Sequence, residues 1–335
     1  MAKVFFITKK NIRDAWLSAV GQVFYKGDDI KTEYDKQKDP PSKDGTVLIE
    51  ITEPFSNPIM RKSKTLKIKS KYGNSYEVYG CLADTYLIGS IQSGYIEEII
   101  DGVNDNLIYD SSVSFPYSYH DRIYNYTPYA LEDQSHVNSI NFNLQFVKKS
   151  DVIKQQKLIK NEKYYPESTV WKVYGKEYNL SEIKSERIAD EKIPIEILEF
   201  PRINQIEYII DKLRESPHSR RAQAITWRPL VDPYHDNPPC LQRIFMRIKD
   251  ERLIMQTTWR SRDLFRAWEA NVNGMIRIQK YVANQLEVEV GHYVDFSNSL
   301  HIYGSSFSEV KDMLNRMRNR GDLPDEIIEL MDKNA

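Results

Sequence analysis

A cysteine directly after two prolines is the residue of this chain best placed to act as a nucleophile. The segment is PPCLQRIFMRI, residues 238–248, with the cysteine at position 240. Each proline fixes its own φ angle and disfavours helix for the residue before it, so Cys240 follows a stiff, extended segment. Apolar side chains then recur at every second position from Ile244 to Ile248, which predicts a half-buried strand. A cysteine at such a strand start could react as a thiolate or could pack as a small apolar residue, and this stretch alone leaves both open.

Other short groups in the C-terminal half carry side chains suited to binding a phosphate or a sugar. The arginines of SRRAQ (219–223) and WRSRD (259–263) have paired N–H donors that match phosphate oxygens, and Ser261 adds a hydroxyl. Taken singly, each arginine group is more simply a surface charge pair, and His301 in HIY (301–303) is more simply a core histidine. Cations beside a cysteine would lower the pKa of its thiol and make the thiolate available near neutral pH.

The spacing of these groups narrows the choice. Arg221 and Cys240 are 19 residues apart, Cys240 and Arg260 are 20, Arg260 and Asn271 are 11, and Asn271 and His301 are 30. These residue types at these intervals resemble the thymidylate synthase family and the related pyrimidine-nucleotide hydroxymethylases. The resemblance covers 201–303 and extends loosely back to YSYHDRIYNY (117–126). It implies an α+β protein of thymidylate synthase-like fold, with a large mixed β-sheet, flanking helices, and sheets packed back to back in a homodimer.

The resemblance implies folate-dependent transfer of a one-carbon unit to C5 of dUMP, giving dTMP. Cys240 would add to C6 of the pyrimidine, which turns C5 into a carbon nucleophile. The carbon would come from 5,10-methylenetetrahydrofolate, with no metal ion required. Tyr119 would assist removal of the C5 proton. A glutamate of GYIEEIIDG (94–102) would relay protons, and we favour Glu98, although the register leaves Glu97 open as well.

The same resemblance assigns binding roles. Asn271 would accept from N3–H and donate to O4 of uracil, where the cytidylate-specific relatives have an aspartate. Asp263 would face the folate pterin. The nucleotide would be held at its phosphate by Arg260 and Ser261, at the same phosphate by Arg220 and Arg221 of the partner subunit, and at its ribose 3′-hydroxyl by His301 and Tyr303.

Departures from the family pattern keep other functions open. Leu241 follows the cysteine where many bacterial members have histidine, and RAWEAN (266–271) lacks the usual Gly-Pro-Phe approach to the asparagine. The last residues, DEIIELMDKNA, differ from the family's segment that closes over folate and excludes water. Water at that site would give 5-hydroxymethyl-dUMP, so a dUMP hydroxymethylase is the first alternative. A catalytically idle nucleotide- or RNA-binding relative is the second alternative, and a cysteine hydrolase is the third.

Composition is that of a soluble globular protein. Hydrophobic residues make up 41% of the 335 positions and charged residues 28%, enough for a substantial core. Since 47 basic side chains oppose 48 acidic ones, no overall field favours nucleic acid or an anionic membrane. Two cysteines fit a reducing compartment, and no apolar run approaches the roughly 20 residues of a membrane span. We therefore expect a cytoplasmic protein that binds dUMP and neither nucleic acid nor a membrane.

The elements that must position these residues mix helices and strands without a regular βαβ repeat, which is typical of an α+β architecture. Helical periodicity predicts helices at 11–25 with Asn11 as N-cap, within 85–102, at 203–213, at 269–286 and after 301. Alternation predicts strands at 47–54, at 65–80 with a turn at Gly73-Asn74, at 221–229, 241–249, 252–259 and 288–296. The polar stretch 26–45 is predicted to be a loop.

The least patterned part of the chain is 130–200. It contains KKSDVIKQQKLIKNEKYYPE and SEIKSERIADEKIP, which are highly charged and have little apolar periodicity. We interpret 1–335 as a single thymidylate synthase-like domain, with 130–200 as a charged insertion on its surface.

Overall fold

The structure is a computed structural model, and its chain divides into two compact units. Unit 1 comprises Met1–Val103, Ile209–Ile225 and Cys240–Ala335, and unit 2 comprises Asn104–Tyr208 and Thr226–Pro239. The structure describes residues 3–32, 35–56, 66–81, 85–109, 117–126, 203–229, 232–234 and 237–334, and the backbone of four short strands between 146 and 196.

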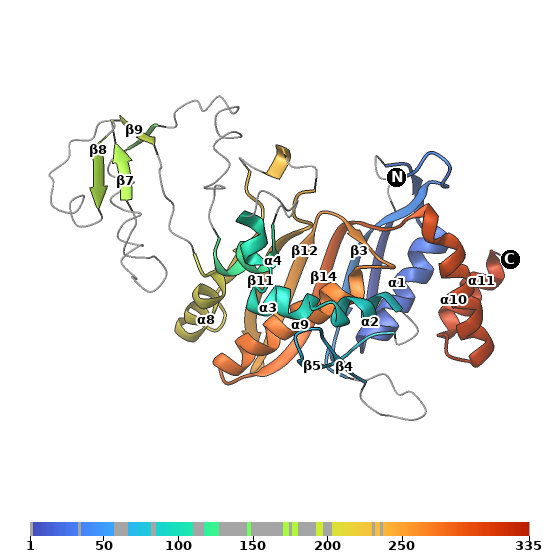
Figure 1. The fold of residues 1–335 in the computed structure, drawn as a ribbon. Helices are drawn as coiled ribbons and strands as arrows, with labels where there is room; N and C mark the ends of the chain where they lie inside the picture. The colour runs from blue at the N-terminus through green and yellow to red at the C-terminus, as the bar shows by residue number, and fades with distance from the viewer. Residues whose placement is uncertain are drawn as a thin grey trace. The chain divides into compact units, whose positions relative to one another are not determined.

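A mixed eight-stranded sheet is the centre of unit 1 (Figure 1). Its strand order is β1-β3-β14-β12-β11-β10, with β2 added to β3 and β13 to β14. β1 pairs with β3, and β12 with β14, in parallel, whereas β3–β14, β12–β11 and β11–β10 are antiparallel. The predicted α+β class with a large mixed sheet is therefore confirmed. The strands are β1 (Val4–Lys9), β2 (Asp28–Ile30), β3 (Ser42–Ile51), β10 (Gln223–Ile225), β11 (Leu241–Lys249), β12 (Arg252–Trp259), β13 (Arg262–Asp263) and β14 (Glu289–Ile302).

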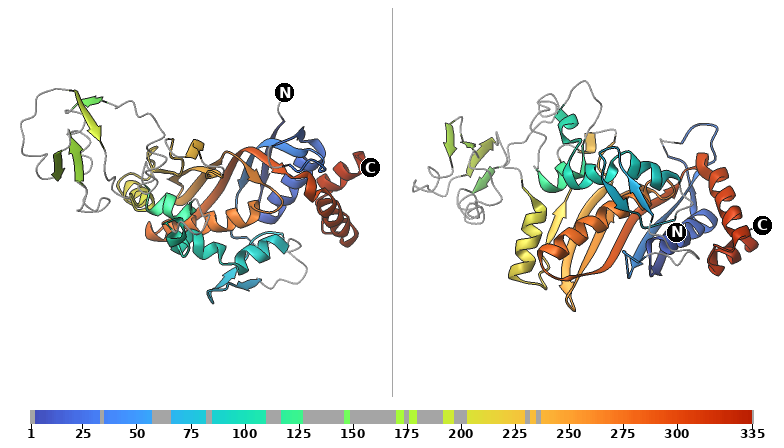
Figure 2. Two further views of the ribbon diagram at one scale, coloured as in Figure 1. Left: turned by 45° about the horizontal axis from the view of Figure 1, so that its top comes forward. Right: turned by 60° about the horizontal axis from the view of Figure 1, so that its bottom comes forward.

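One face of this sheet is covered by helices α1 (Ile12–Lys26) and α9 (Trp268–Gln285), as Figures 1 and 2 show. Along the strands, every second side chain is buried on that face. Ile49 of β3 pairs with Asp295 of β14, and Asp295 with Thr257 of β12, and all three are at most 1% exposed. Because side chains alternate between faces, the residues between them lie on the opposite face, where they are half-buried or exposed.

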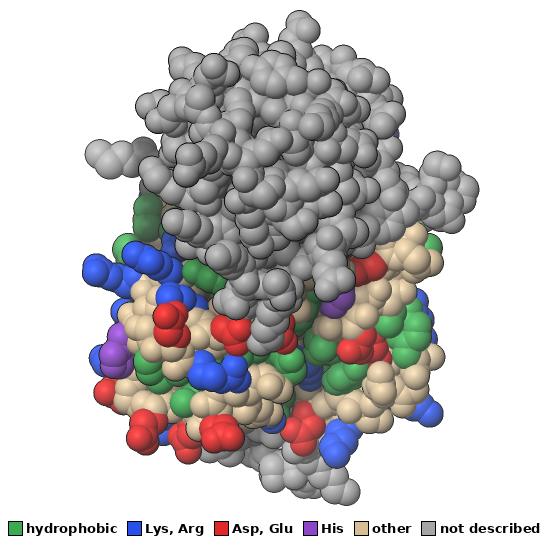
Figure 3. All heavy atoms as spheres, turned by 90° about the vertical axis from the view of Figure 1, so that its left-hand side faces the viewer, with side chains coloured by type: hydrophobic (Ala, Val, Ile, Leu, Met, Phe, Trp, Pro, Cys, Tyr) green, Lys and Arg blue, Asp and Glu red, His purple; other side chains and the backbone are tan. Residues whose placement is uncertain are grey.

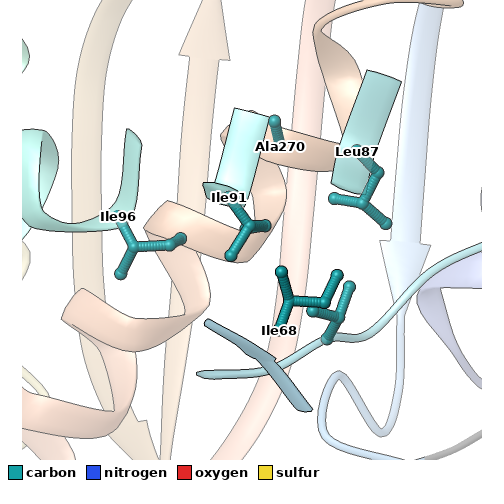
Figure 4. Packing of buried hydrophobic residues seen from close by; sticks show 6 residues of the cluster. Ile68, Leu87, Ile91, Ile96 and Ala270 are labelled. Carbon is teal, nitrogen blue, oxygen red and sulfur yellow. The ribbon is translucent and has the colours of Figure 1, made fainter. Parts of the chain in front are cut away.

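A second layer packs on α9 from the side away from the sheet. It consists of helices α2 (Thr85–Gln92) and α3 (Tyr95–Asp101) and the hairpin of β4 (Lys67–Lys69) and β5 (Ser75–Glu77). Figure 4 shows their shared apolar cluster, in which Ile68, Leu87, Ile91, Ile96 and Ala270 meet. The predicted turn at Gly73-Asn74 is confirmed by this hairpin.

Helix within 85–102 is present as predicted, but the structure divides this segment into two helices. They are separated at Gly94, whose φ of 88° lies in the left-handed region that ends an α-helix. A Cβ at this glycine would also overlap the ring of Tyr72. The break turns α3 so that it runs along α9, which places Tyr95 near the start of that helix.

Most other predicted elements are present, with three corrections. Asn11 caps α1 by accepting from the amide of Asp14 at 2.9 Å, as predicted. The predicted loop at 26–45 contains β2 and the beginning of β3. The strand predicted at 288–296 continues to Ile302, and β1 was not predicted. The remaining helices are α8 (Gln205–Glu215), α10 (Phe307–Arg320) and α11 (Asp325–Lys333).

Unit 2 has a short helix held by buried ion pairs. Arg122 of α4 (Tyr119–Tyr124) pairs with Asp232 at 2.7 Å, and Arg228 pairs with Asp121 at 3.3 Å. The four strands β6 (Phe146–Lys148), β7 (Val170–Val173), β8 (Lys176–Asn179) and β9 (Lys192–Glu196) form a separate sheet. They fall in the predicted insertion 130–200, whose other residues lie outside the described ones, so the domain interpretation stays a prediction.

The surface carries both signs of charge. On the face drawn in Figure 3, basic and acidic side chains of the described residues are interspersed. Within the described part of the chain, no helix is long and apolar enough to cross a membrane.

Candidate active site

Cys240 lies at the start of β11, beside the end of β12. The amide of Arg260 donates to the carbonyl of Cys240 at 2.9 Å, so the antiparallel pair of strands brings the thiol and the arginine together. Cys240, Arg260 and Ser261 are all half-buried. The structure thus places the predicted nucleophile and two of the four predicted phosphate ligands at one end of the same strand pair.

Burial decides the protonation of this thiol. It raises the pKa of Cys240 above its ordinary value, and the nearby guanidinium groups of Arg260 and Arg262 only partly offset this effect. The prediction that the arginines lower the pKa of the Cys240 thiol overall is therefore wrong for a single copy of the chain. The physical reason is that a thiolate loses more solvation at this half-buried strand start than two cations restore.

The pH dependence of thiol alkylation tests this balance. The rate of Cys240 alkylation by iodoacetamide should rise with pH with a midpoint above about 8.5, the ordinary value for cysteine, because burial favours the neutral thiol. Replacing Arg260 by alanine should move the midpoint to still higher pH, since it removes a cation that favours the thiolate. A midpoint below the ordinary value, or one unchanged in Arg260→Ala, would contradict this account.

Asp263 and His301 face each other on the paired strands β13 and β14. The Oδ1 atom of Asp263 accepts from the amides of Phe265 at 2.9 Å and Arg266 at 3.0 Å, which fixes the carboxylate. Burial raises the pKa of Asp263. His301 is 8% exposed, lies edge-on to the Tyr303 ring at 4.7 Å, and its Nε2 atom has no hydrogen-bond partner among the described residues. A buried ring nitrogen without a partner is suited to bind a ligand hydroxyl.

Asn271 lies in the first turn of α9 and is 8% exposed. Its Nδ2 atom donates to the phenol oxygen of Tyr95 on α3. The carboxamide is therefore held by a neighbouring helix, and its Oδ1 atom has no hydrogen-bond partner among the residues that the structure describes. Tyr95 was not among the residues predicted for the site.

The two glutamates of α3 differ in their contacts. Glu97 is 1% exposed and accepts from Ser70 and, at 3.1 Å, from Asn74, so it anchors the β4–β5 hairpin. Glu98 is half-buried and is the next residue along the helix. Both bonds of Glu97 end on its Oε1 atom, and its Oε2 atom is buried without a partner among the described residues. These contacts leave both glutamates open, and Glu98 stays our prediction for the proton relay.

Two predicted residues lie apart from this group, and a third, Tyr119, belongs to the other unit. Arg220 and Arg221 are exposed and line a hollow of about 360 Å³ with Lys212, Glu215, Ser216 and Ser219, which does not include Cys240. Tyr119 is in unit 2, at the first residue of α4, and its ring lies 5.5 Å from that of Tyr117.

Arg262 is a buried cation close enough to Cys240 to affect the pKa of its thiol. It forms an ion pair with Asp295, donates to Ser297 at 3.0 Å, and lies 4.1 Å from the centre of the Trp259 ring. Its side chain is 1% exposed. The only signal in the sequence was its position in WRSRD, one residue after Ser261.

The comparison with known families decides the assignment. The family model described as "Thymidylate synthase" matches residues 137–334, which include Cys240, Arg260, Asn271 and His301. This chain belongs to the thymidylate synthase family. Tyr119 and Glu98 lie before the matched residues, so their roles have no support from the match.

Relatives of this thymidylate synthase family member include archaeal proteins named "Putative thymidylate synthase". The protein of Methanothermobacter marburgensis is 35% identical over 112 residues, which is 33% of this chain and 50% of that protein. That of Methanosarcina mazei is 39% identical over 112 residues, 33% of this chain and 52% of that protein. That of Methanocaldococcus jannaschii is 37% identical over 116 residues, with 32% and 52% covered. The chain thus spans about half the length of the curated relatives it matches.

Proposed function

We propose that this thymidylate synthase family member transfers a one-carbon unit from 5,10-methylenetetrahydrofolate to C5 of dUMP, giving dTMP. The observation that carries the proposal is the position of Cys240 beside Arg260 at the end of one strand pair. A thiol and a guanidinium carried by the neighbouring ends of two paired strands could hold a nucleotide phosphate while the sulfur reaches the base.

The chain's own residues would act in the following order. Arg260 and Ser261 bind the phosphate, and the unpartnered Nε2 of His301, with Tyr303, binds the ribose 3′-hydroxyl. Asn271 accepts from N3–H and donates to O4. The thiolate of Cys240 then forms a bond to C6, and the electrons of the C5–C6 double bond become available at C5.

The remaining steps take place at C5 of the pyrimidine. C5 forms a bond to the one-carbon unit and loses its proton, with Tyr119 assisting. The folate supplies the carbon and the hydride that completes the methyl group, and it leaves as dihydrofolate. Loss of the thiolate from C6 restores the ring double bond and returns Cys240 to its starting state. Asp263, a carboxylate fixed by two backbone amides, is suited to accept from the N–H donors of a pterin.

The proposal includes a homodimer that packs two sheets back to back. The face of the sheet away from α1 and α9 carries an apolar row in which Phe6 pairs with Leu48, and Leu48 with Phe296. Phe6 is 77% exposed, and a contiguous apolar row of this kind is typical of a protein–protein interface. Such a dimer would let the exposed Arg220 and Arg221 of one copy bind the phosphate in the other. Their positive charges would lower the pKa of the Cys240 thiol, which in a single chain is raised by burial.

Product analysis tests the proposed reaction. The purified protein, incubated with dUMP and 5,10-methylenetetrahydrofolate, should form dTMP and an equal amount of dihydrofolate, followed by mass spectrometry and by dihydrofolate absorbance. A product heavier than dTMP by one oxygen, formed without dihydrofolate, would instead identify a dUMP hydroxymethylase. Binding of dUMP with no product of either kind would contradict both and favour a binding protein.

A further inference from the structure

The hydrogen bond between Asn271 and Tyr95 joins two residues 176 positions apart in the sequence. Asn271 donates from Nδ2, and the phenol oxygen of Tyr95 accepts. Asn271 is 8% exposed, and Tyr95 is half-buried. A bond of this kind between two largely buried groups restricts the rotation of the carboxamide, because losing it would leave a buried donor without a partner.

The packing of α3 on α9 keeps the two residues in place. Ile96 of α3 and Ala270 of α9 belong to the same apolar cluster (Figure 4). One turn further along, Ile99 lies so close to Gly274 that a Cβ there would overlap its terminal methyl group. Small residues on α9 thus allow α3 to approach closely, and Tyr95 is held against the first turn of α9 by this packing.

The orientation of a carboxamide decides which pyrimidine it can read. Uracil presents a donor at N3 and an acceptor at O4, so it needs the oxygen of Asn271 opposite N3 and the nitrogen opposite O4. Cytosine presents the reverse, an acceptor at N3 and a donor at N4. Turning the carboxamide over by 180° would therefore exchange recognition of uracil for recognition of cytosine.

We propose that Tyr95 is a specificity-determining residue, which accepts from Nδ2 of Asn271 and so holds the carboxamide in the orientation that reads uracil. The inference rests on the proposed function, since it concerns which base the same site accepts. Turning the amide over would place Oδ1 against the phenol oxygen and force the phenol to redirect its O–H. Without the phenol oxygen, both orientations become similarly accessible.

Binding of dUMP and dCMP to Tyr95→Phe tests the proposal. The dissociation constant for dCMP divided by that for dUMP, both measured by isothermal titration calorimetry, should fall about fivefold to tenfold relative to the unmodified protein. A change of this size is in keeping with the loss of one hydrogen bond. Most of the change should come from tighter binding of dCMP. Tyr86→Phe is the matched control, because it removes a phenol that donates to Glu309 at 2.7 Å on α10, and its ratio should not change.

The binding data distinguish failure of the proposed role of Tyr95 from failure of the proposed function. A purely structural role of Tyr95 would weaken both nucleotides by the same factor and leave the ratio unchanged, which would overturn the inference while dUMP binding still supports the function. An unmodified protein that binds neither nucleotide would overturn the proposed function, and the inference with it.

Discussion

Replacing Cys240 by serine is expected to lower the rate of dTMP formation roughly 10⁴-fold or more, because a hydroxyl cannot replace the thiolate that bonds to C6. The affinity for dUMP should change little, since Arg260, Asn271 and His301 remain in place. Steady-state assays of dTMP formation, together with calorimetry for dUMP, measure both quantities.

The second cysteine of the chain supplies the control. Cys81 is 1% exposed and lies in unit 1, as Cys240 does. Cys81→Ser should retain turnover within a few-fold of the unmodified protein. Full activity in Cys240→Ser, or equal losses of activity in the two variants, would show that Cys240 does not take part in the reaction.

Replacing Arg262 by methionine is expected to lower the free energy of unfolding by about 3–5 kcal/mol, the usual cost of breaking a buried ion pair from one side. The change leaves the carboxylate of Asp295, which is fully buried, without its cation. It also removes the guanidinium from the rings of Trp259 and Trp268, at 4.1 and 5.7 Å. Urea unfolding followed by tryptophan fluorescence reports on this part of the sheet directly.

A substitution at a second, more exposed arginine shows how much of the loss of stability depends on burial of the ion pair. Arg266 is also paired with a carboxylate, Glu309 at 3.0 Å, but the two side chains are 40% and 46% exposed. Arg266→Met should therefore cost at most about 1 kcal/mol. If the two substitutions cost the same, the buried pair does not stabilise unit 1 in the way its geometry implies.

The strands and helices near Cys240 could be predicted because their local patterns are strong. Alternation at 241–249 and 252–259 is present in the sequence itself, and the two prolines before Cys240 fix where the first strand begins. The helix at 268–285 has a broad apolar side that is unambiguous over five turns. These elements alone bring Cys240, Arg260 and Asn271 into one unit.

The contacts that complete the site could not be predicted, because they depend on distant partners. β14 extends to Ile302 since its last residues pair with β13 and with β3, which no local pattern reveals. Arg262 reads as a surface charge in WRSRD, and only the folded chain places Asp295 beside it. Tyr95 is aligned with Asn271 by the left-handed backbone at Gly94, a break that the apolar spacing of 85–102 conceals.

Release of the C5 hydrogen of dUMP is the most direct measurement of the proposed reaction. With dUMP carrying tritium at C5, the protein should release tritium to water only when 5,10-methylenetetrahydrofolate is present and Cys240 is intact, in step with dTMP formation. Tritium that stays on dUMP while the protein binds both compounds would contradict the proposal that this chain forms a carbon–carbon bond at C5.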